Sequence, residues 1–184
     1  MPDALACPSC GRSVPIEGEE IEEEKAEVQE IEELALEKTF TYLIKEEKSE
    51  RSYELFMKAL SKGFKGFCVT RNYPLKIKTK YDLGDTPIIW LSNVGKENSL
   101  RPKDLEKLSV SLEQFLSSTS NGIILLDGLE YLITNNNFLT VLRFVQSLRD
   151  QVAIKEAILL IALNPSTLEQ HELNLLEKEV DVTI

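Results

Sequence analysis

The feature that most limits how this chain can fold is a repeated change of hydrophobic period within residues 39–184. Short apolar or β-branched runs recur at residues 41–45, 67–70, 87–91, 123–127 and 157–163. Most of them are separated by stretches whose apolar residues recur every three to four positions, as in an amphipathic helix. Strands that alternate with helices of ten or more residues need crossover connections, which build a mainly parallel sheet between helical layers. The sequence therefore predicts a three-layer α/β/α fold with a mainly parallel sheet of five to six strands, where residues 180–184 add the sixth.

The expected helices follow the same reasoning. Residues 50–62 and 137–150 place their large apolar side chains on one helical face. Pro102 is expected to open a helix whose buried stripe runs from Leu105 to Leu116, because proline is favoured in a first helical turn. Residues Ser166–Glu169 have the pattern of a capping box and predict the start of a last helix that ends near Lys178.

Residues 1–38 differ in composition from the rest of the chain. Residues 1–15 hold two prolines around a Cys-Pro-Ser-Cys-Gly turn, and residues 16–38 are rich in glutamate. Ile21, Val28 and Ala35 are seven positions apart, the spacing of a coiled-coil seam. A seam of barely three heptads is weak, so residues 16–38 are interpreted as a helical or disordered acidic linker, with a short coiled coil as the alternative. The expected organisation is a knuckle (1–15), an acidic segment (16–38) and one α/β domain (39–184).

The negative charge of the chain is concentrated in the acidic segment. Residues 17–38 hold eleven Glu against two Lys, which gives −9 of the total −10 and leaves −1 for the other 162 residues. Neither part offers the basic face that neutralises phosphate, so we expect no nucleic-acid partner and no membrane partner. The longest apolar runs also fall far short of the roughly 20 residues that span a bilayer, and we expect a cytoplasmic protein.

Cys7 and Cys10 lie in a CPSCG sequence that resembles half of a zinc ribbon. This turn directs two sulfurs at one centre, and structural Zn²⁺ takes four ligands. Cys68 in an apolar strand and His171 in a helix have the contexts of packing and surface residues. We therefore predict Cys7 and Cys10 as zinc ligands, completed in cis or by a second knuckle in a homodimer held by the knuckle and the acidic segment. An idle tail and a redox pair are the alternatives, although a thioredoxin-like pair belongs at a strand-to-helix junction.

Residues 122–132, GIILLDGLEYL, place Asp127 at the end of a strand buried on both faces. Ligands of a parallel sheet bind beyond the carboxyl ends of its strands, so Asp127 and the nearby Glu130 are the candidate residues for a residual metal or another ligand. A carboxylate at this position could hold Mg²⁺, usually through water. The alternative is structural, in which the aspartate accepts N–H bonds from the next turn or caps the next element.

The turn after the first strand lacks the groups that a triphosphate requires. Such a site needs a Gly-rich loop whose N–H groups converge on the phosphates, together with a lysine. Residues 46–56 instead read EEKSERSYELF, and no glycine occurs between residues 18 and 63. Glu46, Glu47 and Glu50 stand where the polyphosphate would arrive, and their Cβ atoms keep the backbone from approaching it. We therefore expect no triphosphate hydrolysis of the usual kind.

Several stretches resemble the archaeal domain of unknown function 835 family over about residues 40–180: YLIKEEKSERSYELF, GFCVTRNYP, PIIWLS, NGIILLDGLEYLI, RFVQSLRD and LNPSTLEQHELNLLE. That family is in turn similar to the core of KaiC and RecA-type ATPases. By this comparison Asp127 matches a magnesium-associated aspartate. However, SERSYELF occupies the phosphate-loop position without its Gly-Lys-Thr, and Thr70-Arg71-Asn72 stands where glutamates activate the attacking water. The resemblance implies a pseudo-enzyme among signalling components, some of them joined to sensor modules.

The sequence thus favours a non-catalytic regulatory or adaptor protein, in archaeal signal transduction, that acts by binding a protein partner. A complete fold without a phosphate loop is the reason for this prediction. The alternative is a nucleotide-binding, ATPase-like enzyme with an unconventional site at Asp127, assisted by Glu130 and Arg71.

Overall fold

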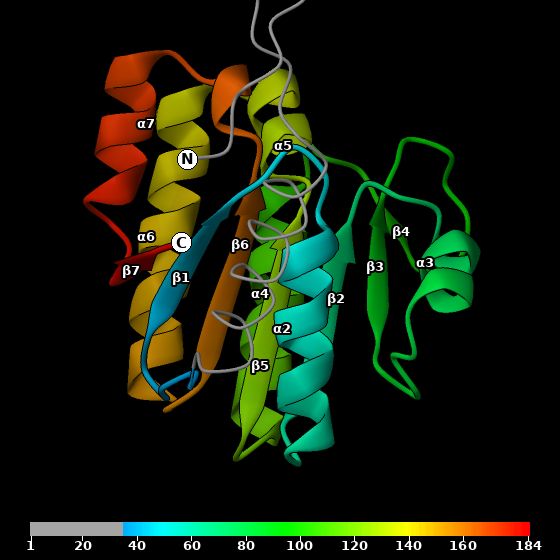
Figure 1. Ribbon diagram of the computed structural model, residues 1–184. Helices are drawn as coiled ribbons and strands as arrows, with labels where there is room; N and C mark the ends of the chain where they lie inside the picture. The colour runs from blue at the N-terminus through cyan, green and yellow to red at the C-terminus, as the bar shows by residue number, and fades with distance from the viewer. Residues whose placement is uncertain (1–34) are drawn as a thin grey trace, which may run out of the picture. The chain divides into compact units, whose positions relative to one another are not determined.

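A single parallel sheet is the frame of the α/β domain, as the computed structural model of residues 35–184 shows (Figure 1). Its seven strands lie in the order β4-β3-β2-β5-β6-β1-β7, and every neighbouring pair is parallel. The strands are β1 (Thr41–Lys45), β2 (Lys65–Thr70), β3 (Ile88–Leu91), β4 (Ser99–Leu100), β5 (Gly122–Asp127), β6 (Ile158–Leu163) and β7 (Val182–Thr183). The predicted mainly parallel α/β fold is confirmed.

Helices lie in the connections between successive strands, except between β3 and β4, and cover the sheet on both faces. They are α2 (Glu50–Ser61), α3 (Pro74–Lys80), α4 (Leu105–Ser118), α5 (Leu129–Asn135), α6 (Phe138–Ile154) and α7 (Gln170–Glu177), with a 3₁₀ turn η1 (Pro165–Thr167). None of the helices in the described part of the chain is long and apolar enough to cross a bilayer.

Alternate strand residues contribute to two apolar layers. On one face, Val69, Leu126 and Ile161 pack in a cluster with the buried sides of α4, α5, α6 and α7. On the other face lies α2, whose Tyr53 and Phe56 are almost fully buried (Figure 1). All six residues of β5 are buried, as expected for a strand covered on both sides.

The sheet has one strand more than the expected five to six because the short strand β4 was not predicted, whereas the sixth strand expected at residues 180–184 is present as β7. β4 and β7 contain two residues each, and β4 pairs only with Trp90 and Leu91 of β3. Helices α3 and α5, which the sequence analysis did not predict, have seven residues each. Seven residues are less than two full periods of the pattern that identifies an amphipathic helix.

The start of α7 differs from the prediction of a capping box at Ser166–Glu169. Asn164 accepts the N–H of Ser166 at 3.0 Å and begins the short η1 turn instead. Leu168 then adopts an extended backbone, which ends that turn, and the reciprocal box forms between Glu169 and Glu172. The α4 helix likewise begins at Leu105, after Pro102 rather than at it.

The knuckle, and the acidic segment as far as residue 34, lie outside the described residues. The predicted zinc ligands Cys7 and Cys10 are among them.

Candidate functional site

Asp127 lies at the carboxyl edge of the sheet, the edge where ligands of parallel sheets bind. It ends β5, with Thr70 of β2 beside it on one side and Ala162 of β6 on the other. Its side chain is only 7% exposed. A charged group so deeply placed needs hydrogen-bond donors around it.

Four side chains donate hydrogen bonds to the Asp127 carboxylate. The Ser49 hydroxyl binds Oδ1 at 2.7 Å. The hydroxyls of Tyr53 and Thr70 bind Oδ2 at 2.9 and 2.8 Å, and the Asn72 amide adds a longer contact to Oδ2 at 3.3 Å. These donors come from the turn after β1, from α2, from β2 and from the turn after β2. The carboxylate therefore ties together segments that are 55 to 78 positions away from it in the sequence.

The Tyr53 hydroxyl is held in its donating, protonated form. Burial raises the pKa of Tyr53, and the neighbouring Cys68 and Asp127 raise it further. Its ring is stacked on Tyr81, with centroids 4.4 Å apart. Burial also raises the pKa of the Cys68 thiol, which lies 3.8 Å from the Tyr53 oxygen. Because the thiolate is the reactive and metal-binding form, Cys68 is suited to packing rather than to chemistry.

Gly128 allows the backbone to turn directly after Asp127. Its φ of 134° lies in a region that side chains rarely adopt, and an added Cβ would meet the Arg71 nitrogen at 3.2 Å. That close approach lets the Arg71 N–H donate to the Asp127 carbonyl at 3.0 Å. The Asp-Gly pair of the sequence thus joins the ends of β2 and β5.

Glu46 caps the N-terminus of α2 from the turn after β1. Its carboxylate accepts the N–H groups of Arg51 at 2.8 Å and Ser52 at 3.1 Å, and the Ser52 hydroxyl also donates to it. N–H groups of a first helical turn have no partner inside the helix and carry partial positive charge. A bound phosphate would use the same groups. The Glu46 carboxylate therefore occupies the first-turn N–H groups of Arg51 and Ser52, which an external anion would otherwise use.

The environment of Glu46 favours the neutral acid more than water does. Burial raises the pKa of Glu46 above its ordinary value of 4.5, and the charge of Asp127 adds to the rise. The hydrogen bonds from Ser52 and Arg51 act in the opposite direction. Two carboxyl groups thus affect each other at the edge where a polyphosphate would add still more negative charge.

The structure gives Glu130 and Arg71 contacts different from those of Asp127. Glu130 accepts the backbone N–H of Asn164 at 2.8 Å, which fixes the chain after β6. The Arg71 guanidinium lies 4.4 Å from the ring centre of Tyr131 and donates to the Leu91 carbonyl at 3.3 Å. Within residues 35–184, no group of three or more His, Cys, Asp and Glu is placed to hold a metal ion. Ligand binding by Asp127 and Glu130 stays a prediction.

Sequence analysis singled out Asp127 but not the donors that surround it. Ser49, Tyr53, Thr70 and Asn72 are common residue types, and no spacing between them signals a shared partner. Their convergence depends on the strand order, since β1 reaches β5 only across β6. The structural alternative for Asp127 expected backbone donors, whereas the donors found here are side chains.

Comparison with known proteins gives a family but no activity. Residues 44–180 match the family described as protein of unknown function (DUF835). The chain belongs to the DUF835 family. This match contains Glu46, Asp127 and all four donors to the Asp127 carboxylate. No curated protein matches the chain.

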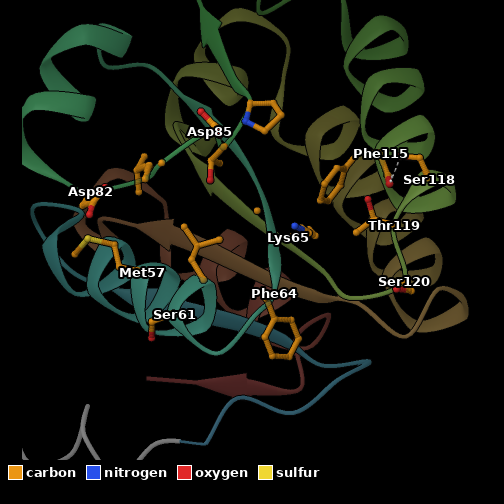
Figure 2. Close-up of a pocket in the computed structure, with 16 residues that line it drawn as sticks. Met57, Ser61, Phe64, Lys65, Asp82, Asp85, Phe115, Ser118, Thr119 and Ser120 are labelled. Carbon is orange, nitrogen blue, oxygen red and sulfur yellow. Dashed lines mark hydrogen bonds between the residues drawn. The ribbon is translucent and has the colours of Figure 1, made fainter.

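Two cavities of this DUF835 domain lie at opposite ends of the sheet. A cavity of about 410 Å³ at the carboxyl edge is lined by Ser49, Asn72 and the lysines 48, 76 and 80, together with Glu47 and Glu50. A larger one of about 940 Å³ lies at the amino end of β2, between α2 and the end of α4 (Figure 2). There Met57 and Ser61 face Phe115 and Thr119, with Lys65 between them. The larger cavity is thus far from the Asp127 carboxylate, and its size alone gives it no role in the chemistry of that edge.

The Asp127→Ala substitution is expected to destabilise the domain by about 2–4 kcal/mol, because it leaves buried hydroxyl donors of Tyr53 and Thr70 without their acceptor. Urea unfolding followed by circular dichroism measures the change. Asp85→Ala removes an exposed carboxylate and should alter stability by no more than about 0.5 kcal/mol. Equal stability of the two variants would contradict a structural role for the Asp127 carboxylate.

Glu46→Gln is expected to change how stability depends on pH. The folded-state pKa of Glu46 is raised, so between its ordinary value of 4.5 and the raised value the folded chain binds more protons than the unfolded chain. The wild type should therefore lose stability relative to Glu46→Gln as the pH rises through this window, and the difference should level off above it. Unfolding free energies from about pH 4 to 8 test this. A difference that stays constant over the range would show that the Glu46 pKa is not raised on folding.

Proposed function

We propose that this DUF835 chain is a non-catalytic regulatory or adaptor protein that acts through protein–protein interaction, in archaeal signal transduction. The observation that supports the proposal is that the carboxylates of Asp127 and Glu46 at the carboxyl edge of the sheet are hydrogen-bonded within the chain. Asp127 is bound by four side-chain donors, and Glu46 is bound by the first turn of α2. A catalytic site for phosphate transfer would need these groups to face a ligand.

The proposal includes a degenerate KaiC- or RecA-type core. In such a core a strand, a phosphate loop and a helix come first, and a strand with a terminal aspartate comes later. Here β1, the turn of residues 46–49 and α2 precede β5, and Ser49 of that turn donates to Asp127. On this interpretation the turn has kept its contact with the aspartate and has replaced the bound phosphate by the carboxylate of Glu46.

Binding of a triphosphate would require Glu46 to leave α2. The Arg51 and Ser52 N–H groups would then be exposed for phosphate, but the displaced carboxylate would lie close to the ligand. Like charges at short distance in a partly buried site repel strongly, because the effective dielectric constant there is well below that of water. The exchange of one internal anion for a larger external one is therefore unfavourable.

One observation favours the alternative, an ATPase-like enzyme with an unconventional site at Asp127. Three lysines, Lys48, Lys76 and Lys80, line the cavity at the carboxyl edge. Lys80 is already paired with Glu50 at 2.7 Å, and Glu47 also lines this cavity. The charges of the two glutamates offset most of the attraction that the lysines would provide.

Calorimetric titration with ATP and magnesium separates the two functions. We expect no saturable heat and no release of phosphate above a protein-free blank. The double substitution Lys76→Ala, Lys80→Ala removes two cations from the cavity and leaves the donors to Asp127 in place, so it tests the cavity without unfolding the domain. Micromolar binding by the wild type would overturn the adaptor function, and its loss in the lysine variant would assign the nucleotide to this cavity.

We also propose that Cys7 and Cys10 bind zinc and that the knuckle contributes to a homodimer. Two thiolates are half of a structural zinc site, so a second chain supplies the missing pair. The double substitution Cys7→Ser, Cys10→Ser is expected to lose the metal and to halve the mass in solution. Elemental analysis and sedimentation equilibrium measure both. Absence of zinc from the purified wild type, or an unchanged mass in the variant, would contradict the shared site.

A further inference from the structure

The exposed side of α3 combines basic and apolar residues in a chain whose net charge is −10. Residues 71–80, RNYPLKIKTK, carry four basic side chains and no acidic one. Leu75 is 62% exposed and Tyr73 is 39% exposed. We propose that the α3 surface, defined as Tyr73, Leu75, Lys76, Lys78 and Lys80, binds an extended acidic segment of a partner protein that also carries apolar side chains.

Two hollows meet at this surface. One of about 810 Å³ is lined by Tyr73, Leu75 and Lys78 together with Trp90 and other residues of the sheet edge, and its rim also holds Lys96, Asp85 and Glu97. The other, of about 430 Å³, is lined by Tyr73, Leu75, Lys76, Thr79 and Lys80. The two exposed apolar residues therefore form a centre with lysines on both sides. An apolar centre within a polar rim is the usual anatomy of a protein-binding surface.

The surface is held in a fixed form by contacts beneath it. Ile77 is buried at 6% exposure and anchors α3, so its neighbours on either side must face outward. The Tyr73 ring packs edge-on against Trp90, with centroids 5.1 Å apart, and the Trp90 Nε1 group donates to the Arg71 carbonyl. A preformed aromatic contact of this kind loses little conformational freedom when a partner binds.

Charge complementarity identifies the partner as acidic. Neither Lys76 nor Lys78 has an ion-pair partner among the residues that the structure describes, and only Lys80 is paired, with Glu50. Carboxylates of a partner would meet two unpaired cations beside an apolar centre. This charge attraction speeds association and fixes how the partner is aligned on the surface.

The contacts of Arg71 and the exposure of Leu75 favour a protein over a nucleic acid as the partner. The fourth basic residue, Arg71, is exposed, but its guanidinium already lies over the Tyr131 ring and donates to the Leu91 carbonyl. Leu75, the most exposed part of the centre, is aliphatic and offers no ring for stacking with bases.

The edge of the sheet indicates an extended conformation for the partner segment. β4 pairs with Trp90 and Leu91 only, so Ile88 and Ile89 have a strand neighbour only on the β2 side. Both residues line the 810 Å³ hollow. The Trp90 N–H faces β4 and the Pro87 carbonyl faces β2, so Ile88 directs its backbone groups to the open edge. An extended segment can pair with Ile88 there while its side chains enter the hollow.

This inference rests on the proposed adaptor function and assigns the α3 surface as the place where the adaptor binds its partner. The probe is a short fluorescein-labelled peptide in which glutamate alternates with leucine, titrated with the full chain by fluorescence anisotropy. We expect saturable binding that weakens with added salt, and affinity reduced about tenfold or more by Leu75→Ser or by Lys78→Glu. A peptide with lysine in place of glutamate should not bind.

Leu139→Ser and Lys103→Glu are the matched controls. Leu139 is 56% exposed on α6 and Lys103 is exposed before α4, and neither belongs to the α3 surface. Both control variants should bind the peptide as the wild type does. Absence of saturable binding, or equal affinities of the α3 variants and the controls, would overturn the inference.

Two further arms separate the possible causes of failure. Displacement of the peptide by oligothymidylate or by phosphatidylserine vesicles at equal total charge would assign the α3 surface to polyanions and overturn its role as a protein-binding surface. Binding of ATP at the carboxyl edge together with peptide binding at α3 would refute the adaptor function alone. Peptide failure without ATP binding would refute the α3 surface alone.

Discussion

The hydrogen bonds to the Asp127 carboxylate hold the carboxyl edge of the sheet together. A charge that is 7% exposed is stable only where donors replace water, and here they come from the β1–α2 turn, from α2 and from β2. Since each donor must stay within reach of one oxygen pair, the ends of β1, β2 and β5 cannot move independently. Three donors bind Oδ2 and one binds Oδ1, so a metal ion would have to compete with them for these oxygens. Structural use and catalytic use of this carboxylate therefore compete for the same oxygens.

Glu46 provides an acceptor for the partial positive charge at the N-terminus of α2, just as the side-chain donors stabilise the negative charge of Asp127. The first turn of α2 presents N–H groups that need an acceptor, and the preceding turn provides one in place of a ligand. Burial and the neighbouring Asp127 raise the pKa of Glu46, and the hydrogen bonds from Ser52 and Arg51 act against that rise. The carboxylate of Asp127 and the first turn of α2 thus both have hydrogen-bond partners within the chain.

Much of the fold was predictable because the strands are continuous apolar runs. β1, β5 and β6 were expected within one residue of their observed bounds, since a strand buried on both faces leaves a clear local signal. The elements that were not predicted are short: α3 and α5 have seven residues, and β4 has two. The shift of the last capping box had a different cause, because the extended backbone of Leu168 separates η1 from α7. Serine is a favoured N-cap residue and glutamate is not, so residue type alone pointed to Ser166 rather than to the observed Glu169.

Of the candidate site, sequence reasoning predicted the place of Asp127 at the carboxyl edge of the sheet, whereas the lack of a triphosphate site stays a prediction. The missing glycines and the glutamates of residues 46–50 are local facts, and they led to the expectation of no phosphate cradle. The donors to Asp127 depend on strand order and could not be read from residue types.

The same limit applies to the α3 surface, where Tyr73 and Leu75 would ordinarily be taken as core residues. Tyr73 and Leu75 are exposed because α3 contacts the core through Ile77, which is its buried residue. Single exposed apolar residues such as Val94 and Ile154 are common on any domain. Tyr73 and Leu75 are a different case, because they lie beside each other near the sheet edge and close to the unpaired Lys76 and Lys78. The free energy available for binding is greatest where apolar contact, backbone pairing and charge attraction coincide.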